Sequence, residues 1–158
     1  MGLQGRVEEA FSEQGALSRM THEFRLRPGQ LDMAQAITRT LEEGGVLVVE
    51  AGTGIGKTFA YLVPALLSGN RVLLSTATKA LQDQLFGRDL PRLVAALGLP
   101  VRTALLKGRG SYVCLHRVGL ARQDSKVSDR SMLRALAKIE QWSQTTRTGD
   151  LAEMPGLE

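Results

Sequence analysis

Residues 51–58 read AGTGIGKT and carry the strongest fold signal in this 158-residue chain. A β-branched apolar run at residues 46–49 precedes them, and an apolar segment at residues 58–67 follows. A glycine-rich turn between a strand and a helix, closed by Lys-Thr, is the sequence context of a phosphate-binding loop. The pattern normally begins with Gly, and Ala51 costs little there as long as its φ stays negative. We therefore predict a nucleotide site rather than an ordinary glycine-rich turn.

Each residue type in this loop suits the binding of a triphosphate. Glycines let the backbone turn until several N–H groups point at one anion, and the next helix adds the partial positive charge of its N-terminus. We expect Lys57 to reach the β- and γ-phosphates of ATP and the Thr58 hydroxyl to ligate Mg²⁺, which makes these two the predicted catalytic residues. The predicted loop contacts are Gly52, Thr53, Gly54, Ile55, Gly56, Lys57 and Thr58.

Strand-like and helical patterns alternate along the first two thirds of the chain. Aliphatic and β-branched runs predict buried strands at residues 46–49, 72–75 and 101–106. Apolar spacing predicts helices at residues 31–43, 58–67, 79–86, 89–97 and 131–144. Alternation with short connections predicts an α/β fold: a P-loop NTPase with a partial parallel sheet and flanking helices. We expect a loose tail from residue 145 onward.

Charge and cysteine content limit the class of protein. Residues 101–134 carry eight basic and two acidic side chains, whereas residues 1–100 carry ten of each. Such a basic block attracts phosphate backbones, although charge alone favours a merely solvated helix face. No apolar run is long enough to predict a membrane span, and Glu8 and Glu9 interrupt any signal core. The single cysteine, Cys114, rules out an internal disulfide and suits the cytoplasm.

Four segments, in order along the chain, carry a resemblance to a known family. They are FRLRPGQ at 24–30, AGTGIGKT at 51–58, STATKALQDQL at 75–85 and KGRGSYVCL at 107–115. Trp142 and the TGDL stretch at 148–151 extend it. Together they resemble superfamily 2 ATP-dependent DNA helicases of the DinG/YoaA type, which are XPD-like. The resemblance implies a RecA-like motor that unwinds DNA from 5′ to 3′ in DNA repair, with a [4Fe–4S] domain beside it.

The resemblance also assigns roles to residues outside the loop. It implies that Arg27 and Gln30 contact adenine, although by spacing alone they are ordinary surface residues. It implies that Thr76 and Thr78 hold a DNA phosphate, with helix capping as the simpler role. The implied partner is single-stranded or forked DNA.

The segment at 107–115 carries the remaining implied contacts. Lys107 and Arg109 are expected at the DNA backbone, or else they are solvated residues of a glycine-rich turn. Cys114 corresponds to the first of four cluster ligands, or else it is a small buried hydrophobe. Four thiolates are needed for such a cluster and this chain has one, so we expect no cluster in this chain alone.

The chain departs from the family pattern in what it lacks. After residue 58 no apolar run ends in Asp-Glu, so the acidic strand that holds Mg²⁺ and orients water is missing. We therefore predict the front piece of a longer helicase, inactive alone and prone to self-association through an unpaired sheet edge. Its expected parts are a connector at 1–23, the first part of the motor domain at 24–110, and an incomplete helical insertion at 111–158. The alternatives are a stand-alone, non-catalytic nucleotide- or DNA-binding module and a small P-loop phosphotransferase.

Overall fold

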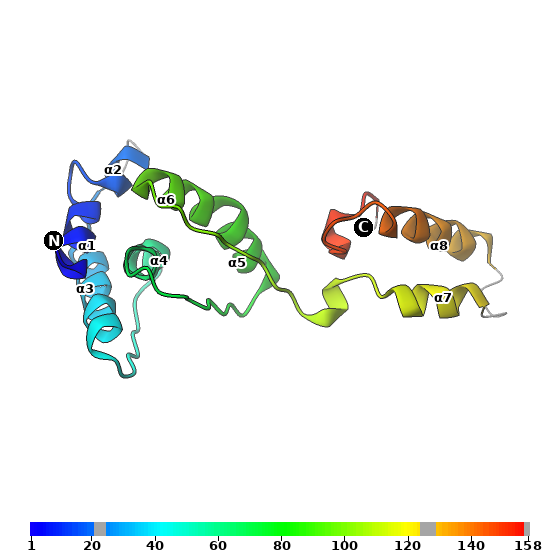
Figure 1. Cartoon of the computed structure of the whole chain (residues 1–158), viewed down its shortest axis with the longest axis horizontal. Coiled ribbons are helices and arrows are strands. Elements are labelled where there is room, and N and C mark those ends of the chain that lie inside the picture. The colour runs from blue at the N-terminus through cyan, green and yellow to red at the C-terminus, as the bar shows by residue number, and fades with distance from the viewer. Residues whose placement is uncertain (21–24, 124–128, 157–158) are drawn as a thin grey trace. The chain divides into compact units, whose positions relative to one another are not determined.

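The computed structural model describes residues 1–20, 25–123 and 129–156 (Figure 1). These residues fall into two compact units, Met1–Thr103 and Ala104–Glu158. The expected domain start at residue 24, the first residue of the FRLRPGQ segment and part of the basic block at 124–128 lie outside the described residues. Among the helices described, none has both the length and the apolar character needed to cross a membrane.

The first unit is built from helices. In chain order they are α1 (Leu3–Phe11), α2 (Ala16–Met20), α3 (Pro28–Glu43), α4 (Lys57–Leu67), α5 (Lys79–Gln84), the π-helical turn η1 (Leu85–Asp89) and α6 (Leu90–Leu97). The helices predicted over the same stretches are confirmed, with ends that differ by a few residues. The α3 helix ends at Glu43 and α6 at Leu97, and the glycine that follows each helix, Gly44 or Gly98, has a positive φ.

The core of this unit forms around α4. Its apolar side chains occur on several faces, so that Ala60, Leu62 and Val63 are all buried. The α1 and α3 helices both pack against α4, and α1 contributes the fully buried Val7 and Phe11. This packing matters for the candidate site because the glycine-rich stretch at 51–58 leads directly into α4.

The predicted α/β fold with a partial parallel sheet is wrong. The described residues form no β-strand, and residues 46–49, 72–75 and 101–106 run as irregular chain. Val46 and Val48 are 93% and 91% exposed, the opposite of a buried strand. The physical reason is that a β-branched run states only a local preference, whereas a strand exists when a neighbour accepts its hydrogen bonds. No such neighbour pairs with these runs within the described residues.

The second unit contains two longer helices and two short 3₁₀ turns. These elements are η2 (Arg109–Ser111), α7 (Leu115–Gln123), α8 (Arg130–Ser143) and η3 (Leu151–Glu153). The prediction of a helix at 131–144 is confirmed by α8, whereas α7 was not predicted because its apolar residues form no stripe. The expectation of a loose tail is wrong up to Gly156, because η3 and a bridge between Tyr112 and Asp150 order this segment.

Candidate functional site

The glycine-rich stretch at 51–58 forms a turn that ends at the start of α4. Gly56 precedes the helix with φ of 88°, a left-handed conformation that side chains rarely adopt. Gly54 also has a positive φ, of 82°. The sequence prediction of a turn that only glycine permits is therefore matched by the backbone, and the α4 N-terminus faces the turn.

Lys57 folds back over the loop that precedes it. Its Nζ donates hydrogen bonds to the carbonyl oxygen of Ala51 at 2.7 Å and to that of Gly52 at 2.8 Å. The ammonium is thus already held within the turn, where a phosphate would meet it. An ammonium has three donors and these carbonyls use two of them, so Lys57 would have to release at least one carbonyl to bind two phosphates.

Two residues from the start of α3 lie against the same turn. Gln30 is 4% exposed, and its Nε2 donates a hydrogen bond of 2.9 Å to the Gly56 carbonyl oxygen. A Cβ atom at Gly56 would lie 2.2 Å from that Nε2, so the contact requires glycine. A Cβ at Gly54 would lie 4.0 Å from Nη1 of Arg27. The structure therefore brings Arg27 and Gln30 to the loop although they precede it by more than 20 positions.

Tyr61 is a residue of this site that the sequence analysis missed. It lies one turn along α4 from Thr58, and the interaction between the two side chains acts on the pKa of the tyrosine. Burial raises the pKa of Tyr61 above 10.0, the charge of Asp89 acts in the same direction, and the Thr58 hydrogen bond opposes both. The i, i+3 spacing on a predicted helix was the signal that could have found it.

The other predicted loop residues differ in exposure. Gly52 and Thr53 are exposed, and Ile55 is half-buried. A cavity of about 350 Å³ lies beside the site, lined by Met33, Ile37, Thr40, Leu41, Leu47, Val49 and Tyr61. Its walls carry no charged group, which makes it unsuited to a phosphate.

Thr76 and Thr78 lie at the start of α5. Thr78 caps this helix, its Oγ1 accepting a hydrogen bond of 3.2 Å from the Leu81 N–H. The Thr76 hydroxyl donates to the Thr78 carbonyl oxygen at 3.5 Å. The capping role considered for these residues is therefore present, and a DNA contact stays a prediction.

The residues expected at the DNA backbone have unequal surroundings. Lys107 forms a buried ion pair with Asp150, so its ammonium does not face solvent, whereas Arg109 is exposed.

Cys114 is also exposed, which contradicts the alternative of a buried small hydrophobe. The described residues hold no group of three or more His, Cys, Asp or Glu side chains placed to bind a metal ion. One thiolate is too few to hold a [4Fe–4S] cluster, which needs four.

Comparison with known proteins gives consistent matches. Residues 30–145 match the DEAD/DEAH box helicase family. The chain is 44% identical to the ATP-dependent DNA helicase YoaA of Haemophilus influenzae, over 97% of this chain and 24% of that protein. It is 45% identical to Escherichia coli YoaA, over 92% and 23% of the two chains. It is 42% identical to the ATP-dependent helicase DinG of Mycobacterium tuberculosis, over 83% and 23%. The chain thus spans about a quarter of the length of these relatives.

Proposed function

Because the chain belongs to the DEAD/DEAH box helicase family, we propose that it is the ATP-binding part of an ATP-dependent DNA helicase. One observation carries the proposal: Lys57, Gln30 and Arg27 meet at a turn in which Gly54 and Gly56 have a positive φ that strains any other residue. Three chemically different groups, a cation, an amide and a guanidinium, thus converge where a nucleotide needs phosphate and base contacts. The three relatives reported above are named as ATP-dependent helicases.

Each residue of the site has a proposed task. Lys57 leaves the carbonyls of Ala51 and Gly52 and binds the β- and γ-phosphates, while Arg27 and Gln30 face the adenine. The Thr58 hydroxyl, one helical turn from Tyr61, is the proposed Mg²⁺ ligand. Mg²⁺-ATP supplies the phosphoanhydride whose hydrolysis drives such a motor. Gln30 also fixes the loop through the Gly56 carbonyl, so base recognition and loop shape depend on the same side chain.

The proposed partner is single-stranded or forked DNA. The proposed activity of the longer protein is the unwinding of duplex DNA from 5′ to 3′ during DNA repair. Thr76, Thr78 and the exposed Arg109 are the proposed phosphate contacts. In the same proposal the ATP-binding part covers residues 24–110, and a helical insertion begins at residue 111. Cys114 would serve as a cluster ligand only alongside cysteines that this chain does not have.

These 158 residues are proposed to bind ATP without turning it over efficiently. Hydrolysis in this class of enzyme needs a carboxylate that holds Mg²⁺ and orients water. No apolar run after residue 58 ends in such a pair of acids. ATPase activity of the isolated chain that rises on addition of single-stranded DNA would contradict this part of the proposal.

A titration with a fluorescent ATP analogue tests the nucleotide site. Lys57→Ala should weaken binding by about 10-fold or more, because it removes a charged hydrogen-bond donor from the phosphates. Lys79→Ala is the matched control, since Lys79 begins α5 as Lys57 begins α4. The control should bind the ATP analogue within about twofold of the wild type, because a substitution at a surface position outside the site usually has a small effect. Equal affinity of Lys57→Ala and the wild type, with circular dichroism unchanged, would refute the site.

A further inference from the structure

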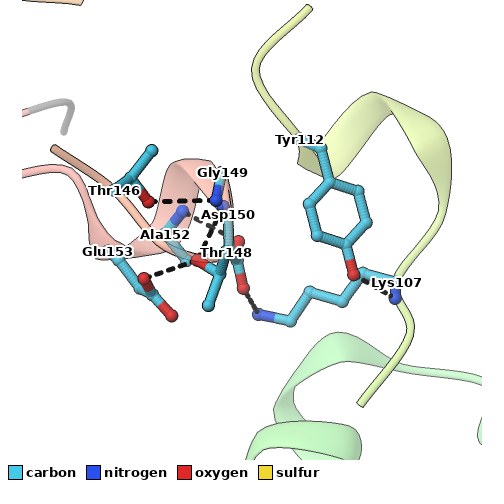
Figure 2. Close-up of polar contacts among 8 residues, drawn as sticks. All are labelled: Lys107, Tyr112, Thr146, Thr148, Gly149, Asp150, Ala152 and Glu153. Atoms are coloured by element: carbon cyan, nitrogen blue, oxygen red, sulfur yellow. Dashed lines mark hydrogen bonds and ion pairs between the residues drawn. The ribbon is translucent and has the colours of Figure 1, made fainter. Parts of the chain in front are cut away.

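The second unit contains a buried ion pair between residues distant in sequence. Nζ of Lys107 lies 2.7 Å from Oδ2 of Asp150, and the two side chains are 6% and 9% exposed (Figure 2). Burying two charges is costly and is repaid only when their geometry is good and further hydrogen bonds satisfy them. The surroundings of the pair supply such bonds on both sides.

Asp150 is held in place by its own loop. Its Oδ1 accepts a hydrogen bond of 3.1 Å from the Ala152 N–H, while its own N–H donates to Oγ1 of Thr148. Thr148 in turn donates to Oε2 of Glu153 at 2.6 Å, and Oγ1 of Thr146 accepts from the Gly149 N–H. Figure 2 shows these bonds around one tight loop, which presents Oδ2 of Asp150 toward Lys107. The carboxylate is therefore pre-organised for the ammonium.

The other side of the pair is a turn that displays Arg109. The Lys107 N–H donates to the Tyr112 hydroxyl at 2.8 Å, and the Ser111 N–H donates to the Gly108 carbonyl oxygen at 2.8 Å. Directly after the turn, the Val113 N–H donates to the Gly149 carbonyl oxygen at 2.8 Å. This turn, at residues 107–112, is thus fixed at Lys107 by the ion pair and, directly after Tyr112, by the loop of Asp150.

We propose that Lys107 and Asp150 form a clasp that fixes the Arg109 turn, so that Arg109 and not Lys107 meets a DNA phosphate. The clasp itself is independent of the proposed helicase function, whereas the role of Arg109 rests on it. Lys107 is thereby a positioning residue. The two basic residues of this turn, which the sequence analysis gave the same expected role, thus have separate tasks.

A double-mutant cycle tests the clasp, read out as hydrogen exchange of the Val113 amide in the full 158-residue chain. Lys107→Met alone leaves a buried carboxylate without its partner and should speed exchange by roughly 100-fold or more. Lys107→Met combined with Asp150→Asn removes both charges and should return exchange to within about 10-fold of the wild type, because a neutral pair carries no uncompensated charge. The double variant keeps the test available if the single variant does not fold.

The Arg122–Glu140 pair is the matched control in the same unit. Its atoms lie 3.5 Å apart and its side chains are 74% and 33% exposed. Arg122→Met should change Val113 exchange by less than about fivefold, as for exposed ion pairs generally. The clasp is refuted if Lys107→Met behaves like Arg122→Met, or if the double variant exchanges faster than Lys107→Met alone.

The salt dependence of single-stranded DNA binding tests the division of labour. Arg109→Ala should lower the slope of log affinity against log salt by about 0.7, as expected for one lost phosphate contact with a single strand. The Lys107→Met/Asp150→Asn variant should keep the wild-type slope; a reduction of about 0.7 in this variant as well would show that Lys107 touches phosphate and refute the proposal. A wild-type chain that binds no DNA would refute the role of Arg109 and the proposed DNA partner, while the exchange experiment still decides the clasp.

Discussion

The helices of Met1–Thr103 pack through apolar side chains, whereas α7 and α8 in Ala104–Glu158 have no buried side chain. In the first unit Val7, Phe11 and Leu93 are fully buried. Among the described residues of the second unit, the buried positions are Ser111, Asp150 and Met154, two of them polar. One unit is held by apolar contacts and the other chiefly by hydrogen bonds and an ion pair.

This difference shows how each unit specifies its shape. Apolar burial is non-directional and tolerates small shifts of its side chains, whereas hydrogen bonds weaken steeply when their angles change. The first unit should therefore respond most to lost volume, and the second to small changes of backbone geometry. Trp142 is the only tryptophan in the sequence and lies in α8, so its fluorescence reports on the second unit alone.

The largest expected effect comes from removing a core side chain of the first unit. Phe11→Ala should destabilise that unit by about 3–5 kcal/mol, because it leaves a cavity where a fully buried ring packs. In urea, the helical signal from circular dichroism should melt earlier while the Trp142 transition stays in place. Leu133→Ala, at an exposed position of α8, is the control and should shift neither transition appreciably. If Phe11→Ala moved both transitions together, the two units would unfold as one cooperative unit, which would contradict this prediction.

A smaller effect is expected from replacing two glycines with nearly the same φ, one in each unit. Gly149 has φ of 70° in the second unit and Gly69 has φ of 71° in the first. Alanine at either position should cost about 1–2 kcal/mol from left-handed strain. Gly149→Ala should move only the Trp142 transition, and Gly69→Ala only the transition of the first unit. The two effects should be similar in size, since the new Cβ at position 149 would make only an ordinary van der Waals contact, 3.4 Å from Cγ1 of Val113, and that at position 69 would meet no atom within 4 Å.

The smallest expected effect is a pH dependence confined to the first unit. The raised pKa of Tyr61 means that the folded state holds this proton more tightly than the unfolded state does. The resulting stability is complete below the unfolded pKa, near 10.0, and is lost as pH rises through the folded pKa. Urea midpoints measured across this alkaline range should fall more steeply for the wild type than for Tyr61→Phe. Parallel curves for the two proteins would contradict the assignment.

Sequence patterns predicted the helices better than the sheet, and the reason is physical. A helix such as α4 satisfies its backbone hydrogen bonds within one segment, so local apolar spacing is sufficient evidence. The runs at 46–49 and 72–75 carry the composition of strands, but a strand depends on a partner that composition does not specify. The bridge that does form, between Tyr112 and Asp150, joins positions that no local pattern connects.

The residues alone predicted the candidate site where its signal is local, and the family resemblance added Arg27 and Gln30. The AGTGIGKT turn at 51–58 imposes its own geometry, and the left-handed Gly54 and Gly56 were foreseeable from it. Lys107 and Arg109 carry the same charge in the same turn, and only the distant Asp150 distinguishes them. The adenine roles of Arg27 and Gln30 stay predictions, although both lie at the loop.

The irregular segment between α4 and α5 has a consequence for the survival of the protein in a cell. Leu73 is 94% exposed, with Val72 and Leu74 on either side and no helix to hold the backbone. Proteolytic cleavage concentrates in exposed, irregular chain, so this segment is expected to be sensitive to proteases. A single cut after Leu73 would place Lys57 and Thr78 on separate peptides. The glycine-rich loop and the candidate DNA contact would then lie on different peptides, although every residue of both would still be present.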